Sequence, residues 1–297
     1  MTFAPRTHDL HGIPATLFLT LAARALAPIE APELGLADHK AEQILARLEI
    51  DPRQFALNAN EVRAVVLRSQ WFAQTTRNFF ERYPEGLCIN VGCGLNASFE
   101  QVEEAGGGRF TWIDLDLPEV IAIRRQFFVE TARRRMIEGD ITKTSLFSTL
   151  PTLQWLDGQP ALIVAEGLLY YLKPAQVEAF LVALAEAADL RRAHTEIAFD
   201  YVSRLGAWIV GRRPAHQQLG TAYAWTLRRP SDLIRRDPRL ELVEDTNVFM
   251  RAMGPWVQQV NTIYRLATGG ELGGCAHLRR SPAPDKSPLS DRRASFH

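Results

Sequence analysis

A glycine-containing turn followed by acidic residues indicates where this chain could bind a nucleotide-like cofactor. One apolar run leads into a turn with Gly92 and Gly94, and the next apolar run ends beside Asp114 and Asp116. In an open α/β sheet, glycine lets the backbone approach a ligand, and an acid on the next strand accepts hydrogen bonds from ribose hydroxyls. Side chains alternate along a strand, so both aspartates point to one face and spacing does not choose between them. Ala97 replaces the third glycine of the dinucleotide fingerprint, so the turn alone specifies no particular cofactor.

Two further acids follow predicted strands. Asp140 follows the predicted strand 136–139, and Glu166 follows the predicted strand 161–165. The carboxyl ends of parallel strands meet at the crevice where open sheets bind ligands. Each acid could instead cap the helix that comes after it. Several like charges are costly to bury together without a ligand or partners, so the group of acids favours a binding site.

The predicted elements would bring these side chains together. Apolar residues recur at helical spacing over 13–80, and from position 87 onward strands alternate with helices. This alternation predicts an α/β fold with a mostly parallel sheet covered on both faces. A helix over 175–188 should lie flat on the sheet. The predicted strands are 87–91, 109–115, 136–139, 161–165, 195–199, 240–249 and 259–266.

We expect one large domain with distinct parts. Residues 1–85 form a helical N-terminal cap within it, and 86–268 form the cofactor-binding core. The segment 202–232 is irregular and contains aromatic residues, and could be a lid or a substrate-pocket insert. The segment 269–297 is rich in Gly, Ser, Pro and Arg. We expect this tail to be disordered, because it cannot bury enough apolar area to offset the entropy of ordering.

Composition argues against several classes of protein. The 297 residues carry no formal net charge, with 46% hydrophobic and 23% charged residues, as in an ordinary soluble globular protein. The arginine clusters have acids nearby and form no extended basic arm, so we expect no nucleic-acid partner. Arg24 interrupts the apolar N-terminal stretch, so we expect neither a signal peptide nor a membrane span. The three cysteines have no metal-binding spacing and no disulfide framework, which favours the cytoplasm and no metal.

Longer motifs resemble the leucine carboxyl methyltransferase family, especially its bacterial branch of O-methyltransferases linked to polyketide tailoring. The resemblance covers most of the chain. Its most specific motifs are Asp-Leu-Pro-Glu-Val-Ile at 116–121 and Ala-Glu-Gly-Leu-Leu-Tyr-Tyr-Leu at 165–172. It implies a class I, Rossmann-like methyltransferase fold with a helical N-terminal lid, and S-adenosylmethionine as the cofactor. Further matching segments are 11–16, 23–25, Arg68, 90–95 and Gly139-Asp140.

The resemblance also implies roles for single residues. Arg68 would pair with the carboxylate of the cofactor's methionine part, a contact that suits the guanidinium fork. Asp116, rather than Asp114, would hold the ribose hydroxyls. The other implied cofactor contacts are Gly92 and Gly94 in the loop, Asp140 and Ile141 at the adenine, and Glu166 at the methionine end. The candidates for a catalytic or substrate-facing role are Tyr170, Tyr171 and His11.

The chain departs from the family pattern at two places. The family usually continues its glycine loop with Leu-Asp-Thr-Arg, whereas residues 95–98 read Leu-Asn-Ala-Ser. The family commonly has an aspartate where this chain has Ala73. Two acids and an arginine are therefore missing together, which indicates that a charged network beside the loop has been dismantled or rebuilt.

Methyl transfer from a sulfonium needs alignment of nucleophile, methyl carbon and sulfur more than acid–base machinery. A carboxylate acceptor is already ionised at pH 7, whereas a phenol or alcohol would need a base such as histidine. We predict an S-adenosylmethionine-dependent O-methyltransferase without a dedicated base, acting on a carboxyl or hydroxyl oxygen of a small polyketide-like metabolite. The alternatives are a methyltransferase for protein C-terminal carboxyl groups, a catalytically silent cofactor-binding interaction protein and, disfavoured by the missing glycine, an NAD-dependent oxidoreductase.

Overall fold

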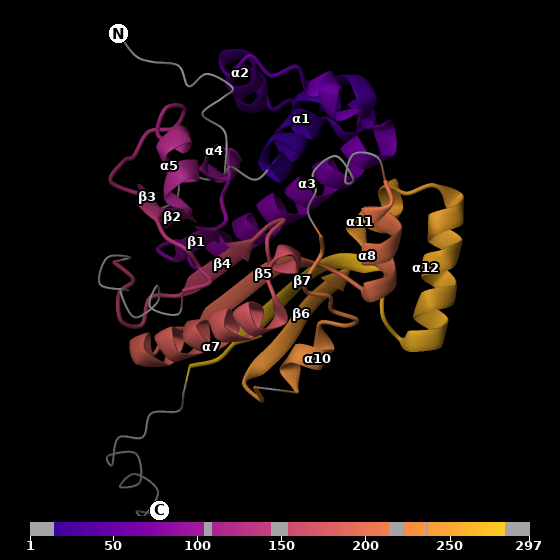
Figure 1. The fold of residues 1–297 in the computed structure, drawn as a ribbon. Coiled ribbons are helices and arrows are strands. Elements are labelled where there is room, and N and C mark those ends of the chain that lie inside the picture. Colours follow the sequence, from indigo (N-terminus) through magenta and orange to yellow (C-terminus); the bar gives the residue numbers. More distant parts are fainter. Residues whose placement is uncertain (1–14, 104–108, 144–153, 214–221, 236, 283–297) are drawn as a thin grey trace, which may run out of the picture.

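A mixed β-sheet forms the centre of the molecule (Figure 1). The structure is a computed structural model that describes residues 15–103, 109–143, 154–213, 222–235 and 237–282. The strands within these residues are β1 (Leu87–Val91), β2 (Thr111–Asp116), β3 (Arg134–Glu138), β4 (Ala161–Ala165), β5 (Thr195–Val202), β6 (Leu240–Thr246) and β7 (Gly273–Arg280). They form one seven-stranded sheet in the order β3-β2-β1-β4-β5-β7-β6. β1 to β5 pair in parallel, and β7 is antiparallel to both of its neighbours. The predicted α/β class is confirmed.

The parallel register brings the carboxyl ends of the central strands together. Every residue of β1 and β4 is buried, as expected for strands covered on both faces. Asn90 of β1 lies opposite Asp114 of β2 and Val164 of β4. The segments that leave β1, β2 and β4 therefore all start at the carboxyl ends of the strands, and these ends position the site.

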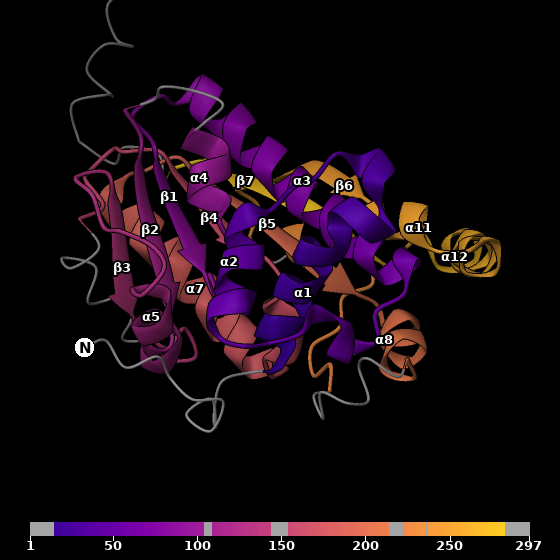
Figure 2. The same ribbon diagram turned by 90° about the horizontal axis from the view of Figure 1, so that it is seen from above.

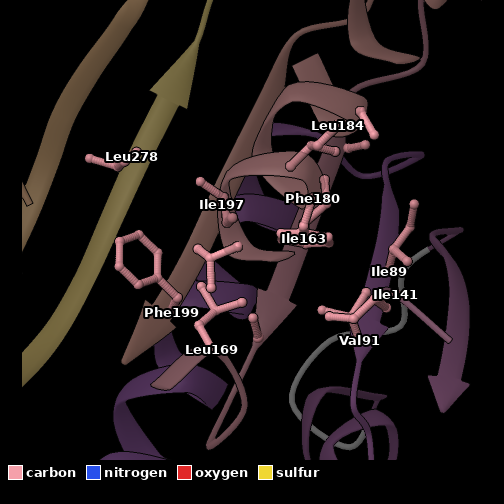
Figure 3. Packing of buried hydrophobic residues seen from close by; sticks show 14 of the residues in the cluster. Ile89, Val91, Ile141, Ile163, Leu169, Phe180, Leu184, Ile197, Phe199 and Leu278 are labelled. Atoms are coloured by element: carbon pink, nitrogen blue, oxygen red, sulfur yellow. The ribbon is translucent and has the colours of Figure 1, made fainter. Parts of the chain in front are cut away.

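One face of the sheet is covered by α7 (Pro174–Arg191). Figure 3 shows Phe180 and Leu184 of this helix lying over Ile163 and Ile197 of the sheet, within one cluster of buried hydrophobic residues. The helix predicted over 175–188 is thus confirmed.

The opposite face is covered by α3 (Ala59–Arg82), which begins at a capping box. The Asn58 side chain accepts a hydrogen bond from the Glu61 N–H, and the Glu61 carboxylate accepts one from the Asn58 N–H. Further along the helix, Phe79 packs in one cluster with Trp112 of β2. These contacts fix the position of α3 along the sheet.

Two helices, α1 (Ala15–Glu30) and α2 (His39–Arg47), lie within the stretch 13–80 for which helical spacing was predicted. Figure 2 shows α1 and α2 at the end of the sheet toward which the β1 arrow points. No helix in the described part of the chain combines the length and apolar character needed to cross a bilayer. The remaining helical segments are η2 (Pro32–Leu34), η3 (Pro52–Phe55), α4 (Ser98–Glu103), α5 (Pro118–Arg124), η5 (Leu169–Tyr171), α8 (Arg204–Gly211), α10 (Ser231–Ile234), α11 (Val248–Ala252) and α12 (Pro255–Thr268).

Three C-terminal predictions were wrong. The predicted strand 259–266 lies inside α12, and the predicted strand 240–249 ends at Thr246. The predicted disordered tail 269–297 contains β7, an interior strand of the sheet. Composition failed for β7 because its polar residues are satisfied by distant partners, such as the Glu196 carboxylate that contacts His277 at 2.7 Å. Residues 283–297 lie outside the described residues.

Candidate functional site

A cavity of about 630 Å³ lies at the carboxyl ends of β1, β2 and β4, and α1 lines one side of it. Its volume is within the ~300–1,000 Å³ that is typical of small-molecule sites. Nearly all of the residues predicted from the sequence to form the site line this cavity, whereas His11 lies outside the described residues. The predicted residues brought together are Arg68, Gly92, Gly94, Asp116, Asp140, Ile141, Glu166, Tyr170 and Tyr171.

The glycine turn after β1 is tied to the end of β2 through Asp116. Gly92 and Gly94 both have positive φ angles, +63° and +53°, which glycine adopts without strain. The Gly94 N–H donates to Asp116 Oδ2 at 2.7 Å, and the Leu117 N–H donates to Oδ1 at 2.8 Å. Burial raises the pKa of Asp116 above its ordinary value, and the two N–H donors oppose that rise. Asp116 therefore presents a hydrogen-bonded carboxylate at the cavity wall.

Asp114, the other aspartate of β2, has a different role. It is fully buried, and it is not among the described residues that line the cavity. Its Oδ2 pairs with Arg124 at 3.1 Å and with Arg134 at 2.8 Å. Burial alone would raise the pKa of Asp114, but the two guanidinium groups hold it below the ordinary value. Asp114 is thus the centre of an internal ion cluster.

Two arginines contact carbonyl groups of the glycine loop. Arg124 Nη1 donates to the Gly94 carbonyl at 2.9 Å, and Arg24 Nη2 approaches the Leu95 carbonyl at 3.5 Å. Arg24 in turn pairs with Asp38 at 3.3 Å. A charged network therefore lies beside the loop although Asn96 and the two residues after it carry no charge.

Arg68 links α3 to the segments after β4 and in β5. Its Nε donates to Glu166 Oε1 at 3.0 Å, and its Nη1 contacts Asp200 Oδ2 at 3.3 Å and the Tyr170 hydroxyl at 3.2 Å. Burial would lower the pKa of Arg68, but Tyr170, Glu166 and Asp200 raise it well above the ordinary value. Arg68 is therefore a buried, permanently charged group at the wall of the cavity.

Asp200 was not predicted as a site residue. It lies in β5 with no exposed surface, and its Oδ1 accepts a hydrogen bond from the Gly167 N–H at 2.8 Å. Burial raises the pKa of Asp200 to about 6, against the effects of Arg68 and the Gly167 N–H. Asp200 directly follows the predicted strand 195–199, so the rule that selected Glu166 would also have found it.

Asp140, two residues beyond β3, both caps a turn and lines the cavity. Its Oδ1 accepts from the Thr142 hydroxyl at 2.6 Å and from the Thr142 N–H at 2.9 Å. These donors hold the pKa of Asp140 below its ordinary value. The Asp140 carboxylate thus caps the turn that follows it and also lies at the predicted site.

Three tyrosines form an aromatic cluster at the wall of the cavity. The ring of Tyr170 packs edge-on against Tyr171 and Tyr223, with centroids 4.7 and 5.0 Å away. The rings of Tyr171 and Tyr223 stack with centroids 5.5 Å apart. Burial raises the pKa of Tyr171 to about 12, so its hydroxyl stays protonated at neutral pH. Tyr223 comes from the segment 202–232, part of which therefore does line the cavity.

The end of the cavity formed by α8 and α11 is largely apolar. Arg213 and Glu61 approach each other there, with Nη1 and Oε1 3.5 Å apart. The apolar residues at this end are Ile209 and Val210 of α8, Met250 of α11, Met253 after it, and Val257 of α12. Among the described residues, no group of three His, Cys, Asp or Glu side chains could hold a metal ion.

A family model, that of the leucine carboxyl methyltransferases, matches residues 18–185, which is more than half of the chain. The chain belongs to this family. It is 30% identical over 243 residues to the tetracenomycin polyketide synthesis O-methyltransferase TcmP of Streptomyces glaucescens, covering 80% of this chain and 84% of TcmP. It is 26% identical to the S-adenosylmethionine-dependent methyltransferase dpfgK of Gibberella zeae, covering 89% of this chain and 93% of dpfgK.

Solved structures show the fold. A methyltransferase candidate from Thermobifida fusca superimposes with a TM-score of 0.57 at 18% identity, covering 95% of this chain and all of that one. As a member of the leucine carboxyl methyltransferase family, the chain is an enzyme with a class I methyltransferase fold, and S-adenosylmethionine is its methyl donor.

The residues that line the cavity lie partly inside and partly outside the segment that matches the leucine carboxyl methyltransferase family. The glycine loop, Asp116, Asp140 and Glu166 lie inside the matched segment 18–185. The apolar residues from α8, α11 and α12 lie outside it, as does Arg213. The matched segment therefore contains the part of the cavity with Asp116, Asp140 and Glu166. Residues beyond the matched segment form much of the part near Arg213.

Proposed function

We propose that this enzyme transfers a methyl group from S-adenosylmethionine to a carboxyl or hydroxyl oxygen of a small polyketide-like metabolite. The observation that carries the proposal is that Asp116, Asp140 and Glu166, from the ends of three parallel strands, line one cavity with Arg68. The similarity to TcmP, which is named as a polyketide synthesis O-methyltransferase, supports the acceptor class.

The charges around the cavity suit a cationic cofactor. The charged side chains that line it are the acids Glu61, Asp116, Asp140 and Glu166 and the arginines Arg24, Arg68 and Arg213. Arg24 and Arg68 also pair with two carboxylates outside the lining, those of Asp38 and Asp200. Acids therefore outnumber bases, which favours a ligand carrying a sulfonium.

The predicted cofactor-binding residues have the following proposed roles. Asp116 holds the ribose hydroxyls, and the left-handed turn of Gly92 and Gly94 lets the backbone approach the cofactor. Asp140 and Ile141 contact the adenine. Arg68 pairs with the methionine carboxylate, and Glu166, beside it, meets the ammonium group.

The chemical step is an in-line displacement. S-adenosylmethionine supplies an electrophilic methyl carbon bound to sulfur. The acceptor oxygen forms a bond to that carbon with a lone pair, and the electron pair of the breaking C–S bond stays on sulfur. The protein contributes by aligning the two reactants and by excluding water, for which α1 and the tyrosine cluster form walls.

A carboxylate is the acceptor that these residues serve best. Among the described residues, no histidine lines the cavity. His194 lies elsewhere, with its Nε2 3.0 Å from Glu196 Oε1. The high pKa of Tyr171 makes its hydroxyl an unsuitable base. A carboxylate is already ionised at pH 7 and needs no base. We therefore assign Tyr170 and Tyr171 to contact with the acceptor rather than to proton transfer.

Calorimetric titration with S-adenosylmethionine and S-adenosylhomocysteine tests the cofactor site. We expect both to bind the wild type, and Asp116→Asn to weaken binding by about tenfold or more, because a buried charge-assisted contact is lost. Asp157→Asn is the control, since Asp157 pairs with Arg191 at 2.9 Å and does not line the cavity. Folded wild-type protein that binds neither compound would contradict the proposal.

A further inference from the structure

One face of α3 runs along the cavity from one charged end to the other. Glu61, Ala64, Val65 and Arg68 all line the cavity. Their spacing of three, four and seven residues places them on a single helix face. Seven residues at ~1.5 Å each separate Glu61 from Arg68 by about 10 Å along the helix axis. The cavity therefore extends at least about 10 Å along α3, from Arg68 to the Glu61–Arg213 pair.

Arg213 is held more loosely than Arg68. Its Nη1 lies 3.5 Å from Glu61 Oε1, and its Nη2 lies 3.2 Å from Met253 Sδ. Charge-assisted hydrogen bonds are usually ~2.7–2.9 Å long, and a thioether sulfur is a weak acceptor. Glu61 is also engaged elsewhere, because its Oε2 accepts from the Asn58 N–H at 3.0 Å in the α3 capping box. A guanidinium with such partners can turn to a stronger anion.

Arg213 also borders a second hollow beside the cavity. A second hollow of about 400 Å³ is lined by Asn58, Asn60, Glu61 and Arg213. Glu61 and Arg213 thus border both spaces.

The cavity wall near the Glu61–Arg213 pair suits an apolar body. Ile209 and Val210 of α8, together with Met250, Met253 and Val257, line this stretch. Unbranched methionine side chains adapt to ligands of irregular outline. An acceptor that fills this stretch would bury apolar surface along its length and place any charge at its ends.

We propose that Arg213 selects the acceptor by binding an anionic group at the end remote from the reacting oxygen. The substrate class is then an elongated, largely apolar acid whose anion lies about 10 Å along α3 from Arg68. Binding of this anion replaces the long contact between Arg213 and Glu61. This inference rests on the proposed function, which assigns the reacting oxygen to the end with Arg68 and Glu166.

A rigid probe of matching length tests the assignment. 4′-Hydroxybiphenyl-4-carboxylate carries its hydroxyl and its carboxylate at opposite ends, and the corresponding carboxamide is its neutral analogue. Both are titrated calorimetrically into protein saturated with S-adenosylhomocysteine. We expect the wild type to bind the carboxylate at least about tenfold more tightly than the amide, as a charge-assisted contact to one guanidinium implies.

Three variants assign the preference to one side chain. Arg213→Gln should bind the two probes alike, and Arg213→Lys should keep part of the preference through its charge. Arg212→Gln is the matched control, because the neighbouring Arg212 guanidinium stacks on the Trp208 ring at 3.7 Å and does not line the cavity. Thermal unfolding of each variant verifies that it is folded.

The inference is overturned if the wild type binds the acid and the amide equally, if it binds neither, or if Arg213→Gln retains the preference. The affinity for S-adenosylhomocysteine is measured separately in the same proteins. Failure of the wild type to bind S-adenosylhomocysteine would contradict the proposed function, whereas normal S-adenosylhomocysteine binding without a preference for the acid would contradict only the assignment of Arg213.

Discussion

Asp200 is a residue whose charge opposes stability while it organises the cavity wall. Its pKa is about 6 in the folded chain, against an ordinary value of 3.8. The native state therefore binds this proton more tightly than the unfolded state does. As pH rises from about 4 to about 6, the Asp200 contribution to the free energy of unfolding falls. The carboxylate faces Arg68, Glu166, Tyr170 and Cys275, and it accepts hydrogen bonds from Arg68 and the Gly167 N–H.

Asp200→Asn should separate stability from binding. At pH 8 we expect the variant to gain stability relative to the wild type, and at pH 5 to gain less, because the wild-type carboxyl is then largely protonated. Its affinity for S-adenosylhomocysteine should fall, since Arg68 loses one carboxylate partner. Urea unfolding at both pH values and calorimetry measure the two effects. An equal stability difference at both pH values would show that Asp200 does not titrate as described.

The sequence predicted residues whose role is carried by a local motif. Asp116 and Glu166 were found this way, Arg68 was selected through the resemblance to the family, and the structure places all three around one cavity. Arg213 and Tyr223 were not selected as site residues, because their partners Glu61 and Tyr171 lie far away in the chain. Only the packing of segments that are far apart in the chain reveals such contacts.

At the scale of elements, local residue preferences misled the prediction for α12. Its β-branched residues favour a strand locally, yet its buried residues Val257 and Asn261 are four positions apart, as one helix face requires. β7 was missed for the opposite reason, since two glycines and polar residues fill it. Arg280 of β7 pairs with Asp189 of α7 at 2.8 Å, a partner that composition does not show. Tertiary contacts therefore decide both elements.

The position of α8 depends on the absence of a side chain at Gly206. A Cβ at this position would lie 1.9 Å from the Leu272 carbonyl oxygen. Gly206→Ala should displace α8, lower the melting temperature by several degrees and weaken binding of the biphenyl carboxylate. Differential scanning calorimetry and the probe titration measure these effects.

Gly211→Ala is the matched control on the same helix. A Cβ at Gly211 would meet nothing within 4 Å, and alanine favours the helical backbone, so the melting temperature should be unchanged or slightly raised. Equal behaviour of the two variants would contradict the close approach of α8 to Leu272.

At the scale of the whole molecule, the site depends on segments from most of the described chain. α1 and α3 line the cavity from the N-terminal part, and α8, α11 and α12 line it from the C-terminal part. The sheet between them is continuous only because β7 joins β5 to β6. We therefore expect loss of β7 to disturb the cofactor end as well.

Truncation tests this dependence. A chain ending at Thr268 lacks β7 and leaves facing edges of β5 and β6 unpaired, so we expect aggregation and no binding of S-adenosylhomocysteine. A chain ending at Pro282 keeps every described element and should bind like the full chain. Solubility, thermal unfolding and calorimetry compare the two. Cooperative unfolding and normal binding of the shorter chain would contradict the interior role of β7.

The place of β7 also has a consequence for synthesis on the ribosome. β7 follows every other described strand in the chain, yet it lies between two of them. At ~5–20 residues per second, β5 and β6 emerge seconds before the strand that joins them. The nascent sheet therefore exposes open edges during translation. Glu241 and Glu244 are exposed on β6 and place negative charge along its edge, which discourages pairing with strands of other chains until the last strand arrives.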